Sequence, residues 1–187
     1  MAGKTVFDNS SAEPFAKGLV QVFTGDGRGK TTAALGTVIR ALGHGLKVCI
    51  IYFIKGDSPS GERSILSQLP NVTVLSYGSG EFIDPANVKP KEKEQAEQAL
   101  TAAREAMLGG NYNIVVLDEV NLAAAWKLIE VDEIIRLIKD KPQNVELILT
   151  GRQADTKIVQ NADLVTEMLK IKHSYDKGIS ARMGIEY

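Results

Sequence analysis

Short apolar runs alternate with segments of helical period along most of the chain. The run from Val48 to Ile54 is continuous and rich in β-branched and aromatic residues, which is typical of a strand covered on both faces. Other runs share this apolar character. The sequence predicts six strands, at residues 18–25, 48–54, 72–75, 114–117, 145–149 and 164–171.

Helical patterns occupy the intervals between these runs. Pro90 opens the longest helix, in which small and apolar residues recur at helical spacing until Gly109-Gly110 stops it. Helices are predicted at 31–42, from Pro90 to this stop, at 131–138 and at 155–161. The alternation predicts an α/β fold with a mostly parallel six-stranded sheet and helices on both faces. Ligands are expected at the carboxyl ends of the strands.

Length and charge restrict the function. With 187 residues, of which 44% are hydrophobic, the chain can bury one core and is too short for two ordinary domains. We expect a single domain at 18–187, preceded by an N-terminal arm at 1–17 that is either a frayed tail or a docking segment. The net charge of -1 offers no basic field for a polynucleotide, so nucleic acid is not an expected partner.

The single cysteine and the lack of long apolar segments bear on location. Cys49 lies within an apolar run, as a buried thiol would, and a chain with one cysteine cannot form an internal disulfide. No segment approaches the roughly 18 to 20 apolar residues of a membrane helix, and the polar N-terminus lacks a secretory h-region. The expected location is the cytoplasm, with no membrane partner.

The most informative chemistry lies in the loop after the first predicted strand. It reads Gly25-Asp26-Gly27-Arg28-Gly29-Lys30-Thr31-Thr32 and opens a predicted helix, which is the context of a P-loop that binds nucleotide phosphates. Its glycines let backbone N–H groups face one anion, while Lys30 supplies charge and Thr31 a hydroxyl for a metal. The usual motif has four residues between its first glycine and the Gly-Lys pair, whereas here there are three.

Other charged residues follow predicted strands and would lie at the same edge of the sheet. Asp118-Glu119 ends the fourth strand, where a carboxylate can reach a magnesium ion on the phosphates. Lys55, Glu62 and Arg63 lie in a predicted loop after the second strand, either in the site or as surface charge. Arg152 follows the fifth strand and could clamp a phosphate or a ribose.

The histidines and the tryptophan allow more than one interpretation. His44 fits a helix cap better than a ligand. His173 follows the last predicted strand, where it would face the cleft or cover its edge. Trp126 fits a core position better than a cofactor platform. The sequence has no signature of a Ser/His/Asp or Cys/His nucleophile, so the protein need not supply the nucleophile.

From Gly18 onward the chain resembles the P-loop type of ATP:corrinoid adenosyltransferases. The resemblance rests on the short loop and on motifs at residues 53–56, 61–63, 116–119, 149–152, 162–168, 171–173 and 184–187. It implies an enzyme that transfers the 5′-deoxyadenosyl group of ATP to cobalt(I) of a corrinoid such as cob(I)alamin and releases triphosphate, in adenosylcobalamin biosynthesis or salvage. Cobalt is then the nucleophile. An ordinary P-loop ATPase or kinase is the alternative, and a nucleotide-binding regulatory module is a third reading.

The resemblance also implies roles for individual residues. Lys30 and the loop N–H groups would stabilise the leaving triphosphate, Thr31 and Glu119 would hold Mg²⁺, and ATP would lie reversed in the loop. Partners implied are ATP, a reduced corrinoid, a flavoprotein reductant and a second copy in a homodimer. The expected ATP-binding residues are Gly25, Asp26, Gly27, Arg28, Gly29, Lys30, Thr31, Thr32, Lys55, Glu62 and Arg152.

The chain departs from the family in the stretch after the third strand. Many members carry a Phe-Thr-Trp run there, whose aromatics are thought to displace the lower axial ligand of cobalt(II). Here residues 78–85 contain a single aromatic residue, Phe82. We expect Phe82 to act in catalysis and, with Ile83, to form an apolar wedge; these two and His173 are the expected corrinoid face.

Overall fold

The structure is a computed structural model that describes residues 16–56, 58, 60–81 and 83–187. The expected N-terminal arm at 1–17 and Phe82 therefore lie largely or wholly outside the described residues. The strands are β1 Val20–Thr24, β2 Val48–Tyr52, β3 Val72–Ser76, β4 Ile114–Asp118, β5 Glu146–Thr150 and β6 Leu164–Glu167. The helices are α1 Lys30–Gly43, α2 Gly61–Leu66, α3 Pro90–Leu108, α4 Val120–Ala125, α5 Val131–Asp140, α6 Thr156–Gln160 and the short 3-10 helix η1 Tyr175–Lys177.

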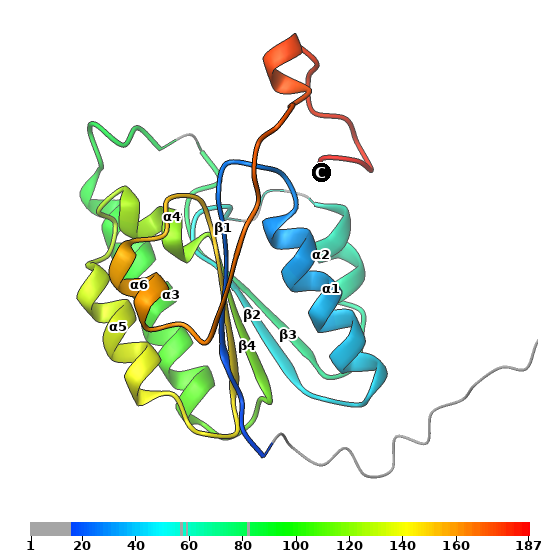
Figure 1. The fold of residues 1–187 in the computed structure, drawn as a ribbon, viewed down its shortest axis with the longest axis vertical. Coiled ribbons are helices and arrows are strands. Elements are labelled where there is room, and N and C mark those ends of the chain that lie inside the picture. The colour runs from blue at the N-terminus through cyan, green and yellow to red at the C-terminus, as the bar shows by residue number, and fades with distance from the viewer. Residues whose placement is uncertain (1–15, 57, 59, 82) are drawn as a thin grey trace, which may run out of the picture.

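The six strands form one sheet in the order β3-β2-β4-β5-β1-β6, and each neighbouring pair is parallel. The predicted α/β fold is confirmed, with a sheet that is parallel throughout. Helices α1 and α2 cover one face, and α3 to α6 cover the other (Figure 1). The carboxyl ends of the strands lie at the upper edge in this view, where the C-terminal segment (residues 168–187) also extends.

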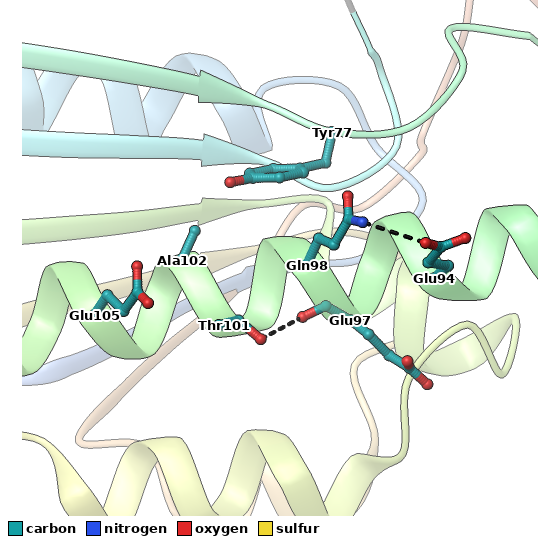
Figure 2. Close-up of a pocket in the computed structure, with 7 residues that line it drawn as sticks. All are labelled: Tyr77, Glu94, Glu97, Gln98, Thr101, Ala102 and Glu105. Atoms are coloured by element: carbon teal, nitrogen blue, oxygen red, sulfur yellow. Dashed lines mark hydrogen bonds between the residues drawn. The ribbon is translucent and has the colours of Figure 1, made fainter.

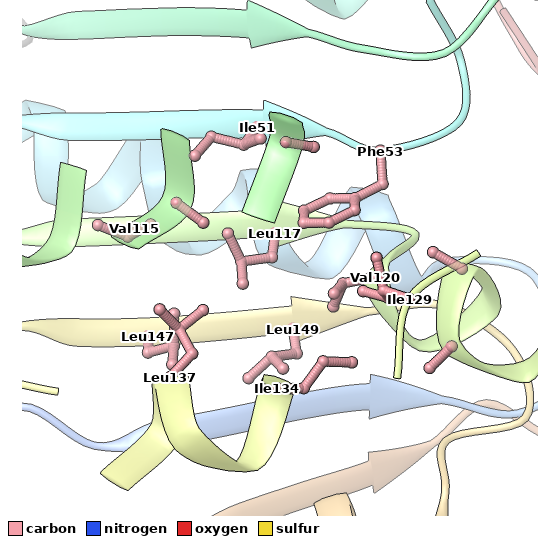
Figure 3. Packing of buried hydrophobic residues seen from close by; sticks show 14 of the residues in the cluster. Ile51, Phe53, Val115, Leu117, Val120, Ile129, Ile134, Leu137, Leu147 and Leu149 are labelled. Atoms are coloured by element: carbon pink, nitrogen blue, oxygen red, sulfur yellow. The ribbon is translucent and has the colours of Figure 1, made fainter. Parts of the chain in front are cut away.

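Two hydrophobic clusters lie on the two faces of the sheet. Side chains alternate along β2, so that Cys49 and Ile51 join the larger cluster while Ile50 and Tyr52 join the smaller one. The larger cluster packs beneath α3, α4 and α5 (Figure 3). Every residue of β2, β4 and β5 is buried, which explains why these strands read as continuous apolar runs.

Several predicted boundaries need correction. Residues 61–66 form α2 instead of a loop, because the Ser60 side chain caps the helix by accepting a hydrogen bond from Arg63 N at 3.3 Å. Strand β6 ends at Glu167 instead of residue 171. Its partner β1 turns away into the glycine-rich loop after Thr24, so the pairing of β6 with β1 ends there.

Two smaller interpretations agree with the structure. His44 is the C-cap residue of α1 and donates its N–H to Ala41 O at 2.9 Å. Trp126 packs against the larger core cluster. Within the described residues, none of the helices combines the length and the apolar character needed to cross a membrane.

Candidate active site

The glycine-rich loop connects β1 to α1 and packs against the segment that follows β6. The N–H of Gly27 donates to Met168 O at 2.6 Å. A Cβ on Gly27 would lie 2.6 Å from the carbonyl oxygens of both Met168 and Leu169, so only glycine fits this approach. Gly25 and Gly29 have φ of 92° and 116°, a conformation that favours glycine. The short loop is thus held tightly by a segment distant in sequence.

Lys30 is the first residue of α1, and its ammonium group spans the loop. Its Nζ donates to Gly25 O at 2.8 Å and to Gly27 O at 2.7 Å. An ammonium group has three protons, so one remains for a ligand. Burial lowers the pKa of Lys30, and the nearby Glu119 carboxylate acts in the opposite direction. The side chain therefore sits where an anion on the loop would meet a desolvated positive charge.

Asp118, at the end of β4, is the centre of the polar network. Its carboxylate is 1% exposed, and its Oδ1 accepts from the hydroxyls of Thr31 and Thr150 at 2.8 Å each. Its Oδ2 accepts from Lys55 Nζ, also at 2.8 Å. Three strand ends and the start of α1 therefore meet at one buried carboxylate. Sequence reasoning named Asp118 only as part of a motif and missed this role.

Glu119 follows Asp118 with the left-handed backbone conformation φ 63°, ψ 20°. Its N–H donates to Thr150 Oγ1 at 3.0 Å. Its Oε2 is buried and has no hydrogen-bond partner among the described residues. Burial raises the pKa of Glu119, and the Asp118 carboxylate raises it further. A buried carboxylate oxygen without a partner is an available ligand for a cation or a donor.

A cavity of about 870 Å³ opens at this edge of the sheet, and most of the predicted site residues line it. From the predicted set these are Gly27, Arg28, Gly29, Lys30, Thr31, Thr32, Lys55, Glu62, Glu119, Arg152 and His173. The remaining lining was not predicted: Leu35, Gly36 and Ile39 of α1, Gly61 and Ile65 of α2, and Gly184 to Tyr187 of the C-terminal segment. One wall is thus cationic and polar, and another is apolar.

The structure does not bring every predicted residue to this cavity. Gly25 and Asp26 belong to the loop but do not line it. Ile83, expected at the corrinoid face, is 4% exposed and belongs to the larger core cluster, while Phe82 lies outside the described residues. Arg63 donates to Gly56 O at 2.6 Å and stacks over Tyr52 at 4.9 Å, which ties α2 to the loop after β2.

The C-terminal segment reaches back to the glycine-rich loop. Arg28 forms an ion pair with Glu186 at 3.2 Å and also donates to Ile185 O. Glu186 is in turn bound by Arg182, whose Nη2 lies 3.0 Å from Oε1. The pair of Arg28 and Glu186 joins residues that are 158 positions apart. The tail motif was visible in the sequence, but no residue pattern indicated that it would close the cavity.

A second, smaller groove of about 360 Å³ runs along α3 (Figure 2). Its lining comes from Tyr77 and from α3, and it includes the acidic side chains of Glu94, Glu97 and Glu105. Negative charges would repel a polyphosphate. The cavity at the glycine-rich loop is therefore the candidate active site.

The donor set of the cavity fits magnesium. The Thr31 hydroxyl donates a hydrogen bond to Asp118, so the lone pairs of the Thr31 oxygen are available to a cation. Glu119 offers a buried carboxylate oxygen. Nowhere in the described part of the chain do three or more His, Cys, Asp and Glu side chains gather as a metal site. Magnesium in nucleotide sites needs no such cluster, since one or two protein oxygens suffice beside the phosphates.

Comparisons with known proteins match nearly the whole chain. The family model described as ATP:corrinoid adenosyltransferase BtuR/CobO/CobP matches residues 16–187. The corrinoid adenosyltransferase of Pseudomonas aeruginosa PAO1 is 34% identical over 186 residues, covering 98% of this chain and 91% of the relative. The protein of the same name from Sinorhizobium is 37% identical, covering 91% and 81%. That of Escherichia coli K12 is 33% identical, covering 91% and 86%.

Proposed function

The chain belongs to the ATP:corrinoid adenosyltransferase family, and we infer that it transfers the 5′-deoxyadenosyl group of ATP to cobalt(I) of a corrinoid. A cobalt–carbon bond forms from the electron pair of cobalt(I). The bond between the 5′ carbon and its oxygen breaks, and its electrons leave with triphosphate. The observation that carries this proposal is the match over residues 16–187, together with a cationic cavity at the loop that the match includes.

The residues of the cavity would act mainly on the leaving group. Lys30 has one proton free for an oxygen of the triphosphate, and Arg28 and Arg152 line the same space. Negative charge on the triphosphate grows as the carbon–oxygen bond breaks, so fixed positive charges stabilise the transition state more than the ground state. Gly27 N–H is already used by Met168 O, so the remaining loop N–H groups would contact the phosphates.

We propose that Thr31 and Glu119 hold Mg²⁺ beside the phosphates. When bound, the ion would neutralise charge on the triphosphate and fix its conformation. Two features support this assignment: the lone pairs of the Thr31 oxygen, and Oε2 of Glu119, which has no hydrogen-bond partner among the described residues. Lys55 and Glu62 also line the cavity. Lys55 shares its charge with Asp118, so we propose that it contributes to ATP binding partly by holding that carboxylate.

The decisive experiment follows both products in one reaction. The protein is mixed with ATP, Mg²⁺ and chemically reduced cob(I)alamin, and triphosphate and the light-sensitive alkylcobalt product are measured together. Equal amounts of the two products are expected. Steady release of ADP or single phosphate without a corrinoid would instead support the ordinary ATPase or kinase. ATP binding without any product would support a regulatory module.

A separate proposal concerns Phe82, whose assignment rests on sequence alone. If Phe82 displaces the lower ligand of cobalt(II), Phe82→Ala should preserve transfer from pre-reduced cobalt(I) but slow turnover from cobalt(II) with a protein reductant. A parallel loss in both assays would remove the wedge role. Ile83 lies in the core, and Ile83→Ala would be expected to lower stability.

We also propose that the protein is a homodimer and lies in the cytoplasm. The sheet edge at β6 and the C-terminal segment carry exposed apolar side chains, including Leu164, Ile171 and Met183, which support a homodimer. Sedimentation equilibrium would measure the mass in solution. The buried Cys49 thiol suits a cytoplasmic protein. A flavoprotein reductant for cobalt(II) is proposed from the family, and a reduced flavoprotein added to the cobalt(II) assay would test it.

A further inference from the structure

Thr150, the last residue of β5, links two acidic residues of the neighbouring strand end. Its hydroxyl donates to Asp118 Oδ1 at 2.8 Å and accepts from the N–H of Glu119 at 3.0 Å. The side chain is 0% exposed. It is absent from the cavity lining, whereas Glu119 is part of it. Thr150 therefore contacts the residues of the site without reaching the space that a substrate would fill.

The backbone of Glu119 needs such a contact. A residue with a side chain rarely adopts φ 63° unless its surroundings hold it there. Glu119 precedes α4 as its N-cap residue, but its side chain makes no capping hydrogen bond. The side chain is thereby left for the cavity, and the Thr150 hydroxyl bonds the backbone N–H at this turn.

The hydrogen-bonding capacity of the hydroxyl also limits its role. A threonine hydroxyl has one proton and two acceptor lone pairs. Here the proton goes to Asp118, and one lone pair receives the Glu119 N–H. With its only proton engaged and no exposed surface, the hydroxyl cannot donate to a substrate. Its action on the reaction must pass through the two acidic residues.

We propose that Thr150 is a positioning residue, which fixes the left-handed turn at Glu119 so that the Glu119 carboxylate faces the cavity and its cation. This inference rests on the proposed function, because it concerns how that site is assembled. It adds a residue that contacts neither substrate, and it explains why a hydroxyl lies at the end of the buried strand β5.

Two substitutions separate the hydroxyl from the methyl group. Thr150→Val keeps the volume and removes the hydrogen bonds, whereas Thr150→Ser keeps the hydroxyl and removes the methyl. ATP binding is measured by calorimetry with and without Mg²⁺, and the ratio of the two affinities reports the metal-dependent part. We expect Thr150→Val to reduce this ratio about tenfold, the size of one or two lost hydrogen bonds at a buried site. Thr150→Ser should stay within about twofold of the unchanged protein.

A double-mutant cycle with Glu119→Gln tests whether Thr150 acts through Glu119. In the Glu119→Gln background, Thr150→Val should have no further effect on the affinity ratio or on kcat. Equal losses for Thr150→Val and Thr150→Ser, or full additivity with Glu119→Gln, would overturn the proposal. Should Thr150→Val not fold, Thr150→Ala replaces it, with Thr150→Ser as the rescue and the same expected order.

The readouts also distinguish the failure of this inference from the failure of the proposed function. The affinity ratio for ATP needs no corrinoid and no turnover. If the unchanged protein binds ATP with Mg²⁺ but forms no alkylcobalt product, the adenosyltransferase assignment fails. The ratio of ATP affinities with and without Mg²⁺ still tests the positioning role of Thr150. If the product forms normally and Thr150→Val keeps the full ratio, the positioning role alone is overturned.

Discussion

The ammonium group of Lys55 lies 2.8 Å from Oδ2 of Asp118. It connects the segment after β2 to the end of β4, two strands that are neighbours in the sheet. The Asp118 side chain is 1% exposed and that of Lys55 is 37% exposed. Burial lowers the pKa of Lys55, but the carboxylates of Asp118, Glu119 and Glu62 act in the opposite direction, and the pKa lies above its ordinary value. Lys55, which the sequence suggested for ATP binding, therefore also forms an ion pair with Asp118.

Removal of the Lys55 charge should destabilise the fold. In Lys55→Met, the buried Asp118 carboxylate loses one partner and keeps the two hydroxyls. We expect unfolding free energy to fall by about 1 to 3 kcal/mol, less than for a fully buried pair because Lys55 is partly exposed. Urea unfolding measures the change, and Lys55→Arg, which keeps the charge, is the matched control.

The difference in unfolding free energy between the unchanged protein and Lys55→Met should depend on pH in one direction only. A raised lysine pKa stabilises the fold fully below the ordinary value of 10.5, and the contribution is lost as the pH rises through the higher folded value. The advantage of the unchanged protein over Lys55→Met should therefore be constant between pH 7 and 9 and decline only above about 10.5. A difference that disappears near neutral pH would contradict the assigned pair.

The sequence predicted the sheet well because its strands are either buried on both faces or bounded by turn residues. The run at Val48 to Ile54 is typical of a strand covered on both faces, and β2, which ends at Tyr52, is buried throughout. Helix α2 was missed because it has six residues and depends on one cap at Ser60, which gives little periodic signal. The end of β6 was misplaced because it is set by the path of β1, a contact that lies far away in sequence.

In the candidate site, too, residues of local motifs were predicted, and roles that depend on contacts distant in sequence were missed. Loop residues such as Lys30 and Thr31 were found because a local motif encodes a local structure. Asp118 and Thr150 lie in the motifs at 116–119 and 149–152, but their roles in the polar network were not predicted, because these roles arise from the pairing of β4 with β5. The part of the cavity lining formed by residues 184–187, the C-terminal wall, was missed for a similar reason. The contact of Glu186 with Arg28 joins residues distant in sequence and exists only after folding.

Lys30 should contribute to rate more than to corrinoid binding. In Lys30→Ala, the leaving triphosphate loses a positive charge that matters most as its own charge develops. We expect the single-turnover rate with pre-reduced cobalamin to fall by about 10² to 10³-fold, with corrinoid affinity changed by less than about threefold. Lys93→Ala, on the exposed face of α3, is the control. Equal losses in rate and affinity would refute the leaving-group role.

Gly27 should be intolerant of a side chain. The Cβ in Gly27→Ala would lie 2.6 Å from two backbone oxygens, so either the loop or the segment after β6 must move. We expect a loss of about 1 to 3 kcal/mol in unfolding free energy, together with weaker ATP binding. Gly43→Ala is the matched control, because that position at the end of α1 has open space around a Cβ and should gain up to about 1 kcal/mol. Similar effects in both variants would disprove the packing argument.

The Cys49 thiol should be unreactive toward thiol reagents in the folded protein. Its side chain is 0% exposed in β2, and burial raises the pKa of the thiol to about 12, so almost no thiolate forms at neutral pH. Labelling with a thiol reagent such as DTNB should be at least about 10³-fold slower in the native state than in denaturing urea, where one equivalent reacts. Fast native labelling would mean that β2 opens locally, which its central position argues against.

The contact between Glu186 and Arg28 should control the C-terminal wall of the cavity without affecting global stability. The Arg28 side chain is 53% exposed, and exposed ion pairs add little to stability, so Glu186→Gln should leave the urea midpoint nearly unchanged. Hydrogen bonds from Arg182 lower the pKa of Glu186 to about 2. A depressed carboxylate pKa means that the contact persists above the ordinary value of 4.5 and is lost only as the pH falls toward 2.

Amide hydrogen exchange at residues 182–187 measures this contact. Exchange should stay slow at pH 4 in the unchanged protein and rise several-fold in Glu186→Gln. The control is Glu133→Gln, which removes an exposed pair on α5 and should leave exchange at residues 182–187 unchanged. Unchanged exchange in Glu186→Gln would mean that the wall is held by its apolar residues and not by this pair.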